Sequence, residues 1–184
     1  MKKSLVLCSI LALVGYMVVF KSDLSGDIYM NGVPTYESGE TYERMNKAYE
    51  ALPDKVKYFI EKEGYRFYVV DMIDNDKYIV GQTVFIQRLI LIKNTRSYIE
   101  QTTFHECGHV LDDELAYSFI SNSDEFLRIY AEEKGNFKVG HNYDYFVSTP
   151  QEYFASAFAE YMMHPIRLRR FTPRTYKFIE QCLK

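Results

Sequence analysis

The feature that most constrains this chain is the pentad His105-Glu106-Cys107-Gly108-His109, because its H-E-x-x-H spacing requires an α-helix to bring its side chains together. In a helix, residues four apart lie on one face, so His105 and His109 can direct both imidazoles at one metal ion. Glu106 is turned by about 100° from His105, where it can act as a base on water held by that ion. Histidine is scarce, with 4 in 184 residues, and two of them fall in this window. We therefore interpret the pentad as a zinc peptidase site.

Length and composition predict one domain preceded by an export segment. Of the 184 residues, 47% are hydrophobic, which is enough for one sizeable core and too little chain for two. The start of the chain differs from the rest, because Met1-Lys2-Lys3 is followed by a predominantly apolar run without charged residues over residues 5–20. This pattern is typical of export signals, so we expect residues 1–21 to be a signal peptide or an N-terminal membrane anchor.

The export segment predicts where the protein acts. No small-x-small cleavage site follows Phe20, which favours a retained anchor. Sixteen helical residues span only about 24 Å, less than a hydrocarbon core of about 30 Å, which favours a cleaved signal. In both cases the N-terminal lysines stay on the cytoplasmic side of the membrane, so residues 22–184 lie on its outer side. We expect an extracellular protein, either secreted or anchored at the outer face of the cytoplasmic membrane through residues 5–20.

Charge and cysteine content argue against a nucleic-acid-binding protein and against a disulfide scaffold. Without Lys2, Lys3 and Lys21 of the export segment, 19 basic residues face 25 acidic ones, so no nucleic-acid partner is expected. Cys107 and Cys182 remain after export, too few for a disulfide scaffold, and their redox state is left open. Stability must therefore come from packing, and the oligomeric state is not predicted.

Hydrophobic periodicity and turn residues predict an α+β fold. Residues 22–39 carry Gly and Pro without a sustained period, so we expect a linker or irregular lead-in there and the domain over 40–184. The expected helices cover 40–52, 53–64, the region after 95 through the pentad to about 119, 123–133, 149–164 and the region from 172 onward. The expected strands cover 65–70 and 84–92, with a polar connection over 71–82, and 136–148 is expected to be a loop. The small sheet should pack on the pentad helix and precede a helical C-terminal half.

A catalytic zinc ion binds three protein ligands and one water, so a third donor is needed beyond the two histidines. In metzincins the motif continues with Gly and His, at positions that here hold Asp112 and Leu115. The ligand must therefore come from further along the chain, where Glu152 and Glu160 are the candidates. We select Glu152, although Thr149-x-x-Glu152 is also a capping box, in which the carboxylate would merely bind the Thr149 amide.

A wider pattern continues beyond the pentad in three places: His105-Glu106-x-x-His109-x-x-Asp112, Tyr145, and Pro150-x-Glu152-Tyr153-Phe154-Ala155. Together they resemble the zinc metallopeptidase family of the anthrax lethal factor catalytic domain and the secreted Pro-Pro endopeptidases, from about residue 103 to the C-terminus. The resemblance implies a zincin-type fold, one zinc ion, and Glu152 as the third ligand beside the two histidines. It also implies that Tyr145, seven residues before Glu152, stabilises the developing oxyanion. The residues alone leave Tyr143 an equal candidate.

One position departs from the family pattern. The residue four after the ligand glutamate is usually a second glutamate, which can orient a ligating histidine, and here it is Ser156. Asp112 and Glu160 are the acidic residues that could replace it. Cys107 is turned by about 200° from His105, so we expect it to fill the core behind the site rather than act as a nucleophile.

These residues predict a zinc metalloendopeptidase in which Glu106 takes a proton from zinc-bound water and passes it to the leaving amine. The substrate would be an extended peptide or protein segment that adds a strand beside 84–92. Proline at the cleaved bond is a hypothesis from the resemblance, and Tyr or Phe would have to contact it because the chain has no Trp. Two alternatives are a non-catalytic partner-binding module of the same fold and a secreted protein with a structural zinc site, in which the coordination shell would be closed.

Overall fold

The computed structural model describes residues 29–31, 35–74, 76–116, 119–139 and 142–184. The expected export segment, residues 1–21, lies outside the described residues and stays a prediction. In the described ranges, no helix combines the length and the apolar character that crossing a membrane requires.

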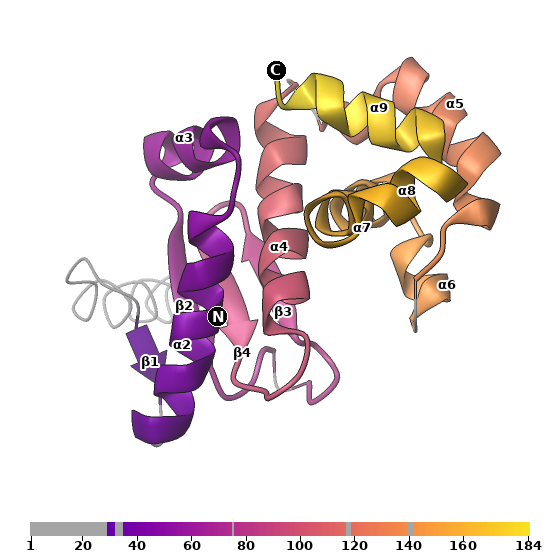
Figure 1. Ribbon diagram of the computed structural model, residues 1–184. Coiled ribbons are helices and arrows are strands. Elements are labelled where there is room, and N and C mark those ends of the chain that lie inside the picture. The colour runs from indigo at the N-terminus through magenta and orange to yellow at the C-terminus, as the bar shows by residue number, and fades with distance from the viewer. Residues whose placement is uncertain (1–28, 32–34, 75, 117–118, 140–141) are drawn as a thin grey trace, which may run out of the picture.

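Three parallel strands and one antiparallel strand build the sheet in the described part of the chain. The strands are β1 (Tyr29–Asn31), β2 (Arg66–Val70), β3 (Gly81–Val84) and β4 (Leu89–Lys93), in the spatial order β1-β2-β4-β3. β1 and β4 each pair with β2 in parallel, whereas β3 pairs with β4 antiparallel. β3 therefore forms one edge of the sheet (Figure 1).

β3 and β4 form a hairpin where a single strand over 84–92 was expected, so that prediction is wrong. The chain turns at residues 85–88, and Arg88 adopts a left-handed conformation with φ of 57°. The Arg88 guanidinium donates a hydrogen bond to the Tyr65 hydroxyl at 2.7 Å and pairs with three nearby carboxylates. Tertiary contacts thus stabilise a turn that the apolar sequence of residues 84–92 does not indicate. β3 itself occupies the end of the segment expected to be a polar connection.

Two helices precede the main part of the sheet, α2 (Thr35–Glu50) and α3 (Asp54–Glu63). The expected lead-in over 22–39 is wrong in two places, because β1 lies within it and α2 already begins at Thr35. The predicted break at Pro53 is confirmed, since it separates α2 from α3. Gly64 ends α3 as expected, with φ of 72° and its N–H donating to main-chain oxygens of the last turn.

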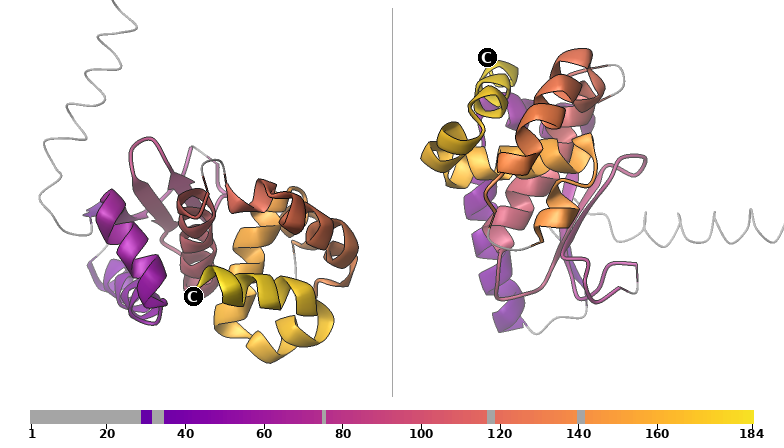
Figure 2. Two further views of the ribbon diagram at one scale, coloured as in Figure 1. Left: turned by 90° about the horizontal axis from the view of Figure 1, so that it is seen from above. Right: turned by 90° about the vertical axis from the view of Figure 1, so that its right-hand side faces the viewer.

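α4 (Ile99–Glu114) carries the pentad through the centre of the molecule (Figure 1). It contacts α2, α3, β3 and β4 on one side and α7 (Pro150–Met163) on the other. α2 and α4 lie side by side on one face of the sheet (Figure 2). Because α4 is covered from both sides, residues 102–108 and 110–112 are all buried. The helix ends at Glu114 rather than near 119, and no Gly or Pro marks that end.

Helices make up the C-terminal half, as predicted: η1 (Ile120–Asn122), α5 (Asp124–Glu133), η2 (Lys134–Asn136), α6 (Tyr143–Phe146), α7, α8 (Pro165–Phe171) and α9 (Pro173–Cys182). α5, α7 and α9 confirm three predicted helices. The Thr149 hydroxyl caps α7 by accepting a hydrogen bond from the Glu152 N–H at 3.1 Å. α6 and α8 were not predicted: α6 is a short helix inside the expected loop, and Pro165 starts α8 as well as ending α7.

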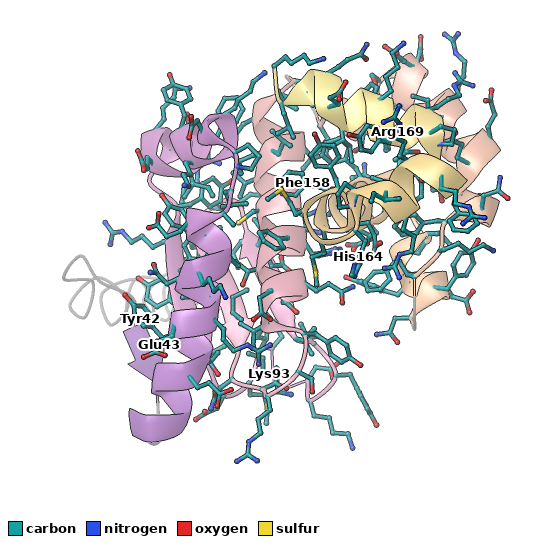
Figure 3. All side chains as sticks on the ribbon, in the orientation of Figure 1. Tyr42, Glu43, Lys93, Phe158, His164 and Arg169 are labelled. Carbon is teal, nitrogen blue, oxygen red and sulfur yellow. The ribbon has the colours of Figure 1, made fainter. Side chains whose placement is uncertain are left out.

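One hydrophobic core joins the sheet to the helices on both sides of α4. It contains Ile90 and Ile92 of β4, Val110 and Leu111 of α4, Phe154 and Phe158 of α7, and Ile179 of α9, all fully buried. Figure 3 shows side chains filling the space between α4 and α7, where Phe158 is labelled. Full burial of one such side chain stabilises the fold by about 1.5–3 kcal/mol. The α+β prediction is confirmed, and packing holds α4 and α7 together.

Candidate metal centre

α4 directs two imidazoles at one point, as the H-E-x-x-H spacing predicts. Nε2 of His109 lies 3.2 Å from Nε2 of His105, and the two rings meet edge to face with centroids 4.8 Å apart. Two ring nitrogens at this distance repel each other when both present lone pairs, and a cation bound by both removes the repulsion. The pair therefore has the geometry of two ligands of one metal ion.

Glu152, at the start of α7, completes the group. Its Oε2 lies 3.2 Å from Nε2 of His105, and its Oε1 lies 3.7 Å from Nε2 of His109. One ligand atom from each of the three residues lies within 4.8 Å of the others. The Thr149 hydroxyl does cap the helix, but the Glu152 carboxylate turns towards the histidines. The capping-box alternative therefore explains the helix end and not the position of the carboxylate.

α4 and α7 approach closely because small residues meet where they pack. A Cβ atom added at Gly108 would lie 2.8 Å from Cα of Ala155, closer than real Cβ atoms come to such neighbours. The missing side chain of Gly108 thus lets the α7 main chain pack directly on the pentad helix. This close approach brings Glu152 within reach of both histidines.

Burial and mutual contacts set the charges of the three residues. Burial, reinforced by the neighbouring His105, lowers the pKa of His109 to about 3, so this ring is neutral at pH 7. Burial also disfavours a charged His105, but Glu152 and Glu106 outweigh it and raise the pKa of His105. Burial acts to raise the pKa of Glu152, and the two histidines outweigh this effect and hold it below its usual value. The group combines an ionised carboxylate with imidazole nitrogens as possible metal ligands.

This donor set fits zinc, which binds His nitrogen and carboxylate oxygen. Oε2 of Glu152 is buried, and apart from its 3.2 Å approach to Nε2 of His105 it has no hydrogen-bond partner in the part of the chain that the structure describes. A buried carboxylate oxygen without a hydrogen bond is costly unless a cation binds it. Three protein donors leave one position of a tetrahedral zinc ion for water.

Ser156 contacts His105 at the other ring nitrogen, with its Oγ 3.2 Å from Nδ1. A serine oxygen that accepts the Nδ1 hydrogen leaves the Nε2 lone pair free for a metal. The expected substitutes do not reach this place and were wrong. Asp112 accepts hydrogen bonds from the N–H and hydroxyl of a serine in η1, and Glu160 pairs with an arginine of α8. Ser156 itself therefore contacts the His105 nitrogen that faces away from the metal centre.

Glu106 is buried on α4 and faces β3. The Thr83 hydroxyl lies 2.9 Å from Oε2 of Glu106 and 3.0 Å from its main-chain oxygen. Burial raises the pKa of Glu106 to about 7, although His105 and Thr83 act in the opposite direction. Thr83 was not predicted to lie here, because it falls between the expected connection over 71–82 and the expected strand over 84–92. A strand starting at Gly81 would have placed Gly81 and Thr83 on one face.

α6 turns one tyrosine towards the metal centre and the other away. The Tyr145 ring lies 6.5 Å from the His105 ring, centroid to centroid. The Tyr145 side chain is 55% exposed, but local desolvation of its hydroxyl and the negative charge of Glu152 raise its pKa, so the hydroxyl is neutral at pH 7. The Tyr143 hydroxyl instead donates a hydrogen bond to the Lys134 carbonyl at 2.8 Å. The geometry thus distinguishes Tyr145 from Tyr143, which the residues alone left as equal candidates.

Cys107 lies in the hydrophobic core, as expected from its position on α4. Burial raises the pKa of its thiol well above the usual value, which disfavours the nucleophilic thiolate. Cys107 and Cys182 are both free thiols in the structure. The pair therefore contributes no cross-link to the fold.

Comparisons with known proteins give a family match and a structural match. Residues 60–182 match the family described as anthrax toxin lethal factor, N- and C-terminal domain. Among solved structures, the chain is similar to the Pro-Pro endopeptidase PPEP-2 from Paenibacillus alvei, with 18% sequence identity and a TM-score of 0.64, covering 84% of this chain and 95% of that one. No curated protein matches the chain. At this identity the structural similarity concerns the fold, and it confirms the expected zincin-type α+β architecture.

Proposed function

Because the chain belongs to the anthrax toxin lethal factor family, we propose that it is a zinc-dependent metalloendopeptidase that hydrolyses peptide bonds in extended protein segments. The observation that carries the proposal is the convergence of His105, His109 and Glu152, whose ligand atoms lie within 4.8 Å of one another. These residues would hold one zinc ion with an open fourth position. When bound, the metal lowers the pKa of a water towards neutrality and polarises the peptide carbonyl.

Glu106 and Tyr145 provide the proton and hydrogen-bond chemistry in this proposal. Glu106 takes a proton from the attacking water and returns it to the amine that leaves. The Tyr145 hydroxyl donates a hydrogen bond to the carbonyl oxygen as negative charge develops there. Because water attacks directly, no covalent bond between the chain and the substrate is needed.

The position of β3 at the edge of the sheet supports the proposal that the substrate binds as an extended peptide. Edge strands present main-chain N–H and C=O groups that an added peptide can pair with. The strand expected to bind substrate covered 84–92, but β4 is paired on both sides, so this role passes to β3. A peptide beside β3 would run along the strand that contacts Glu106 through Thr83.

We also propose that residues 1–21 direct the chain out of the cytosol. The lysines and apolar run of this segment support export, and the proposed peptidase would then act on extracellular proteins. N-terminal sequencing of the exported protein tests this: a chain starting after residue 21 indicates a cleaved signal, and an intact N-terminus in the membrane fraction indicates an anchor. Retention of the full-length chain in the cytosol would contradict the proposal.

The alternatives are a non-catalytic partner-binding module of the same fold and a protein with a structural zinc site. A binding module has no need for a buried Glu106 beside the three ligand residues. A structural site would require a fourth protein ligand, and the candidate group found among the described residues contains three. The observed arrangement favours the enzyme.

Metal analysis combined with cleavage of an unbiased peptide library tests the proposed function on the wild type, Glu106→Ala and Glu152→Ala. We expect one zinc per wild-type chain and cleavage, zinc without cleavage in Glu106→Ala, and loss of zinc in Glu152→Ala. A zinc-loaded wild type that cleaves no peptide and no unfolded protein would support the binding module instead. The same library reports whether proline is preferred at the cleaved bond.

A further inference from the structure

Two residues of β3 face α4 beside Glu106. Gly81 and Thr83 are two apart in a strand, so they lie on the same face of the sheet. The Thr83 hydroxyl oxygen lies 2.9 Å from Oε2 of Glu106. A Cβ atom added at Gly81 would lie 2.6 Å from Oε1 of Glu106. Both carboxylate oxygens therefore lie against the edge strand.

The Thr83 hydroxyl restrains the orientation of the buried Glu106 side chain. A glutamate has three side-chain torsions, and a buried carboxylate strongly favours the orientation in which a donor reaches it. The same hydroxyl oxygen lies 3.0 Å from the main-chain oxygen of Glu106. The single hydroxyl hydrogen is shared between two acceptors, so Thr83 lies against both the carboxylate and the helical turn that carries it.

Gly81 leaves the space that this orientation of Glu106 requires. Besides its close approach to Oε1, a Cβ atom at this position would overlap with Cγ2 of Thr102 on α4. Any larger residue at position 81 must therefore displace the Glu106 carboxylate, the Thr102 side chain or the strand itself. The spacing Gly81-x-Thr83 combines free space and a hydrogen-bond donor on one face of β3.

We propose that Thr83 is a positioning residue for Glu106. Its hydroxyl holds the carboxylate in the orientation from which Glu106 takes the proton of the attacking water, and Gly81 keeps that orientation accessible. This inference rests on the proposed function, because it concerns the base of the same reaction. Thr83 itself touches no reacting atom, so its effect is exerted through Glu106.

The matched variants Thr83→Val and Thr83→Ser test the proposal. Valine keeps the β-branched shape and removes the hydroxyl, whereas serine keeps the hydroxyl. We expect kcat to fall about 10- to 100-fold in Thr83→Val, with KM and zinc content unchanged, and to be largely retained in Thr83→Ser. Gly81→Ala should also lower kcat while zinc is retained. A wild-type kcat in Thr83→Val, or an equal loss in Thr83→Ser, would overturn the proposal.

Crystal structures of the metal-free variants provide a readout that does not depend on activity. We expect the Glu106 carboxylate to stay within hydrogen-bond distance of residue 83 in Thr83→Ser and to leave this position in Thr83→Val. An unmoved carboxylate in Thr83→Val would overturn the proposal. Thr83→Ala carries the same expectations if the valine variant does not fold. A wild type without peptidase activity would reject the proposed function alone, since these structures still show whether Thr83 orients Glu106.

Discussion

Oγ of Ser156 lies 3.2 Å from Nδ1 of His105, while Nε2 of the same ring faces His109 and Glu152. An acceptor at Nδ1 fixes both the tautomer and the direction of the ring. A hydroxyl is a weaker acceptor than a carboxylate, because it carries no negative charge. This chain therefore orients one ligand of its candidate metal centre with a neutral group.

Ser156→Ala should weaken zinc binding about tenfold or more, because the His105 ring loses the contact that orients it. The fold should be retained, since the change only removes an oxygen between α4 and α7. Competition with a chelator measures the Kd for zinc, and thermal denaturation of the metal-free protein measures stability. Ser97→Ala, at an exposed serine before α4, is the matched control. An unchanged Kd in Ser156→Ala would show that the contact has no role in binding.

Tyr145→Phe and Tyr143→Phe form a second matched pair. Loss of the Tyr145 hydroxyl should lower kcat about 100-fold or more, the usual effect of removing one donor to a developing oxyanion, with zinc content unchanged. Tyr143→Phe removes a hydrogen bond to the Lys134 carbonyl and should leave kcat close to that of the wild type. Steady-state kinetics on one cleaved peptide gives both values. Similar losses in the two variants would reject the assigned role of Tyr145.

The elements that the sequence predicts well carry local signals. Pro53 separates α2 from α3, Gly64 ends α3 in a left-handed conformation, and Thr149-Pro150 opens α7. Each signal acts within a few residues, through a cap or a fixed φ angle. The pentad is similar, because its spacing needs only the helix on which it lies.

The elements that were missed depend on contacts distant in the sequence. Arg88 turns the β3–β4 hairpin in a conformation that Tyr65 and distant carboxylates stabilise. The roles of Gly81 and Thr83 require that hairpin to pack on α4. Ser156 is a partial exception, because it lies four residues after Glu152 and helical spacing puts both on one face of α7. Ser156 was identified at this position, but its contact with His105 was not predicted because an acidic substitute was expected instead.

Gly108→Ala should destabilise the protein by about 1–3 kcal/mol and also weaken zinc binding. The added Cβ would lie 2.8 Å from Cα of Ala155, so α7, which carries Glu152, must move away from α4. Gly39→Ala is the control, because a Cβ at that position in α2 meets nothing within 4 Å. It should be neutral or stabilising by up to about 1 kcal/mol. Urea denaturation of the metal-free proteins measures both effects, and equal stability of the two variants would contradict the close approach.

Asp112 should make stability depend on pH through its burial on α4. Its two oxygens accept hydrogen bonds from the N–H and hydroxyl of Ser121, both at 2.7 Å. Burial, aided by the neighbouring charge of Asp113, raises the pKa of Asp112 from 3.8 to about 6, against the effect of the Ser121 hydrogen bonds. In this pH window the folded state holds a proton that the unfolded state has released. The free energy of unfolding should therefore decrease as the pH rises through the window.

Asp112→Asn isolates this contribution, because the amide can still bond Ser121 but does not titrate. Relative to the wild type, the variant should gain stability as the pH rises from about 4 to about 6, by at most about 1.4 kcal/mol per pH unit, and the difference should be constant above that. Urea denaturation of both metal-free proteins across this range measures the difference, in which the titrations of the metal-centre residues cancel. A difference that does not change with pH would show that Asp112 has an ordinary pKa in the folded protein.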